Sequence, residues 1–125
     1  MKLDDAKLDL EGIAGDIRSL RETTLDFLLD AFGVVREALI CRRESADPRE
    51  YYQERPLEGW HYLQVAKRAI PVFEEVLLAS PGIACGAYLR SSIRTLNWFV
   101  RELEDTYGPL SGLSLTEFYQ SRRSP

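Results

Sequence analysis

The chain contains long segments in which apolar residues recur at intervals of three and four. The clearest is residues 57–79, where apolar side chains recur at intervals of 4, 3, 4 and 3: Tyr62, Ala66, Ala69, Phe73 and Val76. This spacing places them on one face of an α-helix. Pro71 lies inside the segment and is expected to kink this helix or to split it into two. Because no stretch of the sequence alternates as a half-buried β-strand does, we expect an all-α fold, a mostly antiparallel bundle of three long helices with short flanking helices.

The ends of the other two long helices follow from capping residues, prolines and glycines. A capping-box pattern begins at Ser19, so the first long helix is expected to start there or to run through from Asp16, and to end near Arg43. The last long helix is expected to start at the cap-then-proline signal of Ser80 and to reach Tyr107.

Shorter helices are expected around these three. Residues 1–18 indicate a separate or frayed N-terminal helix, with a break or fraying at Gly12 and Gly15 because each glycine weakens a helix by about 1 kcal/mol relative to alanine. An Asp-Pro pair indicates a helix at 48–54, and residues 109–125 indicate a tail with a short helix. The whole chain, 1–125, is expected to form a single domain.

Composition and charge restrict the classes of protein. The 125 residues are 45% hydrophobic and 29% charged with a formal net charge of −4, which is typical of a globular domain and does not favour non-specific nucleic-acid binding. The basic residues are 13 arginines against three lysines. This bias suits bidentate contacts to carboxylate or phosphate, although the base composition of a genome alone can also produce it.

The residues that usually hold metals or cofactors do not form recognisable motifs. Cys41 and Cys85 lie in apolar helical context without a zinc-binding spacing, so we expect reduced thiols in the core. Paired Glu-x-x-His units, Walker loops, Rossmann glycines and nucleophile elbows are missing, so no metal, no cofactor and no catalytic residue is predicted. The sequence shows no signal peptide and no apolar run of the roughly 18 residues that a membrane span needs. We therefore expect a cytoplasmic protein without membrane association.

One row of polar residues on the last long helix indicates a binding surface. Arg90, Arg94, Asn97 and Arg101 follow one another at intervals of 4, 3 and 4, so they share one strip of the helix. On a helical wheel Trp98 lies beside this strip, opposite the apolar seam. Arginine and tryptophan form cation–π contacts and are enriched at interface hot spots. These five residues are therefore predicted to bind a partner, unless a second layer of the same domain covers Trp98.

The same spacing recurs on the first long helix in Asp26, Asp30, Gly33 and Glu37. These acidic residues and the arginines could pair within one chain or across a two-fold axis, and such pairs would set register more than stability. Alternatively, both rows are solvated faces with no mutual contact.

A second motif involves the single histidine. Arg55 and His61 are separated by five residues, which resembles the R-x(4–6)-H pattern of HEPN-type helical ribonucleases. The resemblance covers these two residues and implies RNA cleavage across a dimer of helical bundles. The alternative is that His61 is an ordinary histidine near the start of a helix, beside Trp60.

The predicted function follows from the apolar surface of the first long helix and from the arginine row. This helix is apolar around most of its circumference, which three helices alone would not cover, so we expect a homodimer or an obligate protein partner. The function expected is that of a non-catalytic interaction protein, such as an accessory subunit, regulator or inhibitor of another macromolecule. The alternatives are a nucleic-acid-binding small subunit of a larger complex and the HEPN-like ribonuclease.

Overall fold

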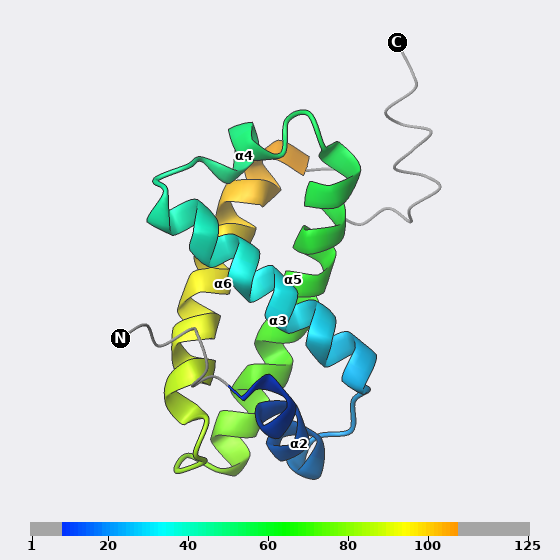
Figure 1. Cartoon of the computed structure of the whole chain (residues 1–125), viewed down its shortest axis with the longest axis vertical. Coiled ribbons are helices and arrows are strands. Elements are labelled where there is room, and N and C mark those ends of the chain that lie inside the picture. The colour runs from blue at the N-terminus through cyan, green and yellow to red at the C-terminus, as the bar shows by residue number, and fades with distance from the viewer. Residues whose placement is uncertain (1–8, 108–125) are drawn as a thin grey trace.

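The protein is an all-α bundle. The computed structural model describes residues 9–107, with side chains up to residue 104, and the short helix predicted in the tail lies outside these residues. Three long helices, α3, α5 and α6, pack with two short ones, so the predicted fold class is confirmed (Figure 1). The described helices are α2 (Leu10–Leu20), α3 (Leu25–Arg43), α4 (Pro48–Tyr51), α5 (Pro56–Ala79) and α6 (Gly86–Tyr107).

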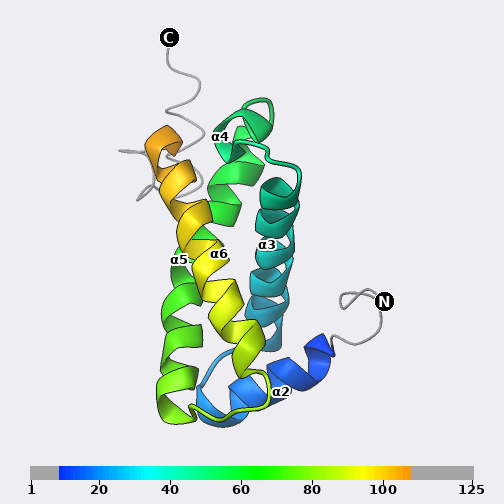
Figure 2. The same ribbon diagram turned by 90° about the vertical axis from the view of Figure 1, so that its left-hand side faces the viewer.

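The long helices form two layers. Helices α5 and α6 lie side by side and antiparallel, and α3 packs across both of them (Figures 1 and 2). The short helix α4 covers one end of the bundle, and α2 covers the other end, beside the loop between α5 and α6. Helix α6 is therefore buried on two sides, by α5 and by α3.

The core is built from one face of each long helix. The Phe32 ring of α3 stacks on the Phe73 ring of α5 with 6.4 Å between centroids, and the Tyr88 ring of α6 meets Phe32 edge-on at 5.8 Å. The core also contains fully buried aliphatic and small side chains along the three long helices, which include Leu28, Ala31, Ala38, Leu63, Ala66, Leu89, Leu96 and Leu103. Burial of this apolar surface is the main force that holds the three helices together.

Helix α2 runs without a break through Gly12 and Gly15, so the predicted break is wrong. The Asp9 carboxylate caps the helix by accepting the Gly12 N–H at 3.0 Å. The opposite face packs into the core through Ile13, Ala14 and Ile17. Capping and burial together outweigh the low helix propensity of the two glycines.

These two glycines provide the first testable prediction. No atom lies within 4 Å of a Cβ added at Gly15, whereas a Cβ at Gly12 would approach Oδ2 of Asp9 to 2.6 Å. Gly15→Ala is expected to stabilise the protein by about 0.5–1 kcal/mol through helix propensity. Gly12→Ala should lose this gain because it displaces the Asp9 cap. Urea denaturation followed by circular dichroism compares the two variants, and an equal gain for both would contradict the role of Asp9.

The first long helix begins later than predicted. Helix α3 starts at Leu25, not at Ser19, and it ends at Arg43 as expected. The Thr24 hydroxyl accepts the N–H of Phe27 at 3.1 Å and caps the helix. The capping-box pattern at Ser19 therefore does not mark the start of this helix. A short non-helical segment separates α2 from α3, and its last residue, Thr24, is the N-cap.

The other two long helices agree with prediction in part. Helix α5 continues through Pro71 and is not split. Helix α6 begins at Gly86 and not directly after Ser80. Residues 80–85 form two successive turns, in which the N–H of Ile83 donates to the Ser80 carbonyl at 3.0 Å and the N–H of Gly86 donates to the Ile83 carbonyl at 2.9 Å. The chain needs these residues to reverse direction, because α6 is antiparallel to α5.

One buried tyrosine packs α4 against the three long helices. Tyr52 directly follows this short helix, and only 1% of its surface is exposed. Its ring makes edge-on contacts with Tyr62 of α5 at 5.6 Å and with Phe99 of α6 at 6.0 Å. Its hydroxyl donates to Oε1 of Glu37 on α3 at 3.3 Å. Tyr52 therefore connects α4 to all three long helices.

Both cysteines are free thiols in the core, as predicted. Cys41 lies on the inner side of α3, where burial and the nearby carboxylates of Glu37 and Glu44 raise its pKa to about 11. Burial also raises the pKa of Cys85, in the loop before α6. A raised pKa keeps both thiols protonated and unreactive at neutral pH.

Candidate interaction surfaces

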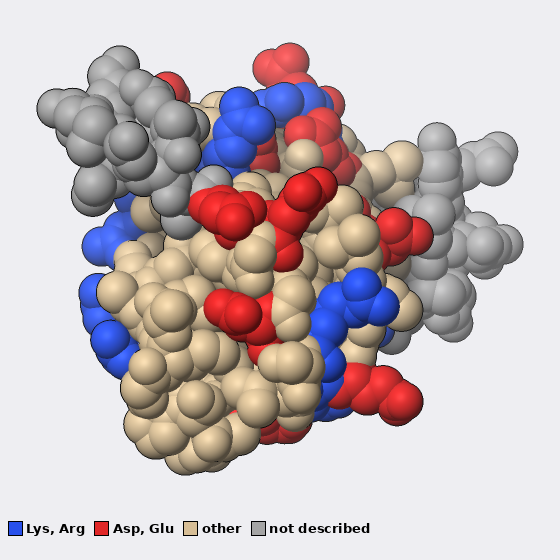
Figure 3. Space-filling view, turned by 60° about the horizontal axis from the view of Figure 1, so that its bottom comes forward, with Lys and Arg blue, Asp and Glu red and all other residues tan. Residues whose placement is uncertain are grey.

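The four polar residues of the predicted row lie on the outer side of α6. Arg90, Arg94, Asn97 and Arg101 are all exposed, and the buried residues of α6 lie on the other side of the helix. We call these four residues the arginine strip. Figure 3 shows basic side chains along one edge of the molecule, on the side where α6 runs in Figure 1. The strip faces solvent because α5 and α3 cover the rest of the helix.

The arginines of the strip carry positive charge that no described carboxylate neutralises. Among residues 9–104, ion pairs form elsewhere, and none includes Arg90, Arg94 or Arg101. The Glu104 carboxylate of α6 is paired instead with Lys67 of α5 at 3.0 Å. Three guanidinium groups in a line therefore remain available for carboxylate or phosphate groups of another molecule.

Trp98 is partly buried, so other residues of the same chain cover part of its side chain. The Arg42 guanidinium of α3 lies 5.4 Å from the centroid of the indole ring, a cation–π contact within the chain. The helical wheel placed Trp98 opposite the apolar seam. The buried side of α6 is centred closer to Ser92 and Phe99, because α3 covers the helix as well as α5. Trp98 therefore lies at the border between the core and the surface, next to the arginine strip.

The acidic row on α3 does not pair with the arginine strip inside the chain. Asp26, Asp30 and Gly33 are exposed, and Glu37 is partly buried with the Tyr52 hydroxyl as its partner. Within the part of the chain that the structure describes, no ion pair joins the two rows. Two of the alternatives therefore remain, a pairing across a two-fold axis and two solvated faces without mutual contact.

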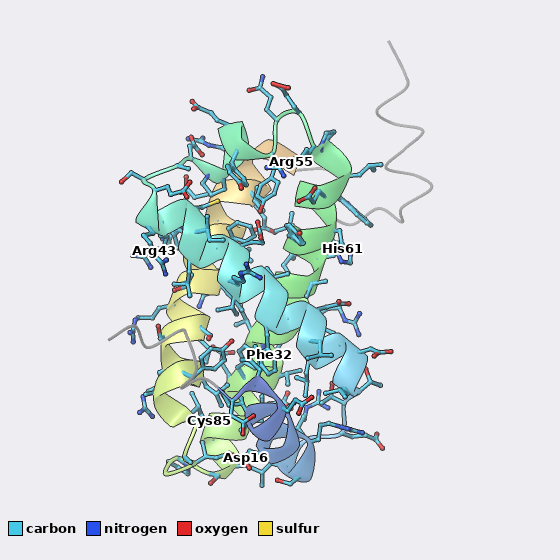
Figure 4. All side chains as sticks on the ribbon, viewed as in Figure 1. Asp16, Phe32, Arg43, Arg55, His61 and Cys85 are labelled. Atoms are coloured by element: carbon cyan, nitrogen blue, oxygen red, sulfur yellow. The ribbon has the colours of Figure 1, made fainter. Side chains whose placement is uncertain are left out.

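Sequence reasoning missed an apolar groove along the outer side of α3. The groove has a volume of about 660 Å³, and Leu10 of α2 and Tyr88 of α6 line it together with residues of α3. Leu29, which is 46% exposed, lies in it. We call this surface the α3 groove; Leu29, Gly33, Arg36, Ile40 and Arg43 follow one another along it. Figure 4 labels Phe32 and Arg43, which also line it. The residue in the sequence that could have indicated this groove is Gly33, a glycine in the middle of a helix.

The structure places the two residues of the ribonuclease-like motif in different surroundings. The Arg55 guanidinium lies 4.8 Å from the Tyr51 ring centroid and 3.6 Å from the Glu58 carboxylate. His61 is exposed on the outer side of α5 (Figure 4). Arg55 thus has partners that hold it at the α4 end of the bundle, which lends the ribonuclease interpretation no support.

Comparison with known proteins gives no family assignment. No protein-family model, no curated protein and no solved structure matches this chain. In the described residues, no group of three or more His, Cys, Asp or Glu side chains could hold a metal ion. None of the described helices is long and apolar enough to cross a membrane.

Proposed function

We propose that this protein is a non-catalytic interaction protein that binds a protein partner through the arginine strip of α6. The observation that supports this is the line of exposed guanidinium groups of Arg90, Arg94 and Arg101, none of which forms an ion pair within the described residues. Like charges at neighbouring turns of one helix repel each other, and an acidic partner relieves this repulsion. The expected ligand is a protein surface with two or more carboxylates in a row.

The charge distribution favours an acidic protein over a nucleic acid. Nucleic-acid-binding domains usually present a broad basic surface, and their affinity depends on many phosphate contacts. This chain has a formal net charge of −4, and its strip is one helix wide. Bidentate arginine–carboxylate contacts give specificity without a strongly basic surface.

Reversal of one charge in the strip tests the proposal. Arg94→Glu is expected to weaken capture of the native partner at least tenfold, about 1.4 kcal/mol, because it places a carboxylate opposite an acidic surface. Arg18→Glu is the matched control, since Arg18 is exposed on α2 and undergoes the same change of charge. Both variants and the unchanged protein serve as bait in an extract of the native host, and the captured proteins are quantified.

The outcome separates the possible partners. Equal capture by Arg94→Glu and Arg18→Glu would show that the strip is not the binding surface. Loss of capture by the unchanged protein after nuclease treatment would identify a nucleic acid as the partner. Circular dichroism of both variants confirms that the helices are retained.

A further inference from the structure

We propose that the α3 groove binds the α3 groove of a second copy of this chain, so that two α3 helices lie side by side and parallel in a homodimer. This inference is independent of the proposed function, because no residue of the arginine strip lines the groove. It assigns the expected homodimer interface to the α3 groove and the orientation of the two α3 helices to parallel.

The spacing of the residues along the groove suits a second helix. Leu29, Gly33, Arg36, Ile40 and Arg43 follow one another at intervals of 4, 3, 4 and 3, the spacing of the contact seam in two-stranded coiled coils. Four of these five residues are exposed and Ile40 is half-buried, so the described helices leave most of the seam uncovered. A second helix with the same spacing fits against it along its length.

Gly33 allows a second helix to approach α3 closely. No heavy atom lies within 4 Å of the position that its Cβ would take, so nothing inside the chain requires a glycine there. Glycine weakens the middle of a helix, but it allows another backbone to approach closely. In a parallel pair about a two-fold axis, the two Gly33 residues meet at the same level, and the helices can come into contact there.

The charges next to the seam favour a parallel orientation of the two helices. Asp30, Glu37 and Glu44 follow one another at intervals of seven along one side of it. In a parallel pair the two-fold axis brings Arg36 and Arg43 each opposite the same residue of the partner subunit. The carboxylates of Glu37 and Glu44 then lie beside these arginines of the other helix, where they offset the repulsion. An antiparallel pair would instead bring the two acidic sides together. Neither arginine forms an ion pair within the described residues, so both can pair with carboxylates of the partner subunit.

The first test is the oligomeric state. Sedimentation equilibrium between about 1 and 100 μM, an interval chosen to include the affinities of typical dimers, is expected to show a dimer of the unchanged full-length chain. Gly33→Gln should increase the dissociation constant at least a hundredfold, because a long side chain keeps the helices apart. Gly15→Gln is the matched control, since Gly15 is also helical and open, and it should remain dimeric. Circular dichroism of the Gly33→Gln monomer during heating should show a cooperative unfolding transition, which demonstrates that the variant still folds.

The second test is an exchange of charges. Arg43→Glu alone and Glu44→Arg alone should each weaken the dimer at least tenfold, because each creates like-charge contacts across the two-fold axis. An equimolar mixture of the two variants should dimerise again, because the glutamate introduced at position 43 of one chain then faces the arginine introduced at position 44 of the other. Restored association in the mixture supports the parallel orientation, and its failure overturns it.

Three results would overturn the proposal as a whole. The first is a clean monomer of the unchanged protein over the full concentration range. The second is a dimer that Gly33→Gln leaves intact. The third is a dimer that Arg94→Glu dissociates, which would place the interface on the arginine strip. If Arg94→Glu loses its acidic partner but remains dimeric, the two surfaces are separate, as we propose.

Discussion

Replacement of Tyr52 by alanine is expected to lower the free energy of unfolding by about 3–5 kcal/mol. This is a large share of the roughly 5–15 kcal/mol that stabilises a typical domain. The side chain is almost fully buried and lies against Tyr62 and Phe99. Its loss leaves a cavity between α4 and the long helices, and it leaves the Glu37 carboxylate without its hydroxyl partner.

Tyr52→Phe is the matched control for this prediction. It keeps the ring and removes only the hydroxyl that donates to Glu37, so a loss of about 1 kcal/mol is expected. Urea denaturation at neutral pH, followed by circular dichroism, gives both values. A loss for Tyr52→Ala no greater than that for Tyr52→Phe would show that the ring does not hold α4 in place.

The second large effect is a loss of stability at alkaline pH. Burial, together with Glu37 and Glu44, raises the pKa of Cys41 from 9.0 to about 11, and burial raises the pKa of Tyr88 from 10.0 to about 12. Burial also raises the pKa of Tyr52. The folded state therefore keeps protons that the unfolded state releases. Each group contributes stability that is fully present below its unfolded pKa and that is lost as the pH rises through its folded pKa.

The expected decrease begins at about pH 9 for Cys41 and at about pH 10 for the two tyrosines. Between the unfolded and folded pKa values, each group lowers the free energy of unfolding by up to about 1.4 kcal/mol per pH unit. Urea denaturation at half-unit steps from about pH 8 to pH 10 isolates the thiols. Cys41→Ala should flatten the decrease, and Cys85→Ala, whose thiol has the less perturbed pKa, should flatten it less. Equal slopes for the unchanged protein and Cys41→Ala would contradict the assignment.

Helical periodicity was enough to predict the fold class, but it did not fix where helices begin. The segment from Pro56 to Ala79 was recognisable because its apolar spacing is continuous, and Asp47 before Pro48 correctly indicated α4. The start at Ser19 was wrong because several residues near a helix end can act as a cap, and tertiary packing selects one of them. The start after Ser80 was wrong because local signals do not show how many residues a reversal of the chain needs.

The candidate surfaces were predictable only to the extent that one helix determines them. The arginines of α6 are on one side of that helix whatever its neighbours are, so their common face could be predicted. The environment of Trp98 depends on Arg42 and the end of α3, which the sequence does not place beside it. The α3 groove also depends on Leu10 and Tyr88 from other helices. Gly33 indicated the groove, but a solvated helix face tolerates glycine equally well.

The separation of the arginine strip from the α3 groove has a consequence for avidity. A dimer that forms through the groove carries two strips, one on each α6, and both stay accessible. A target with two acidic segments, or a target that is itself dimeric, can then be held at both strips at once. The second contact forms at a high effective concentration, so two contacts that are weak by themselves can together slow the dissociation of the target. Binding strength would in that case depend on the concentration of the chain itself, through the fraction that is dimeric.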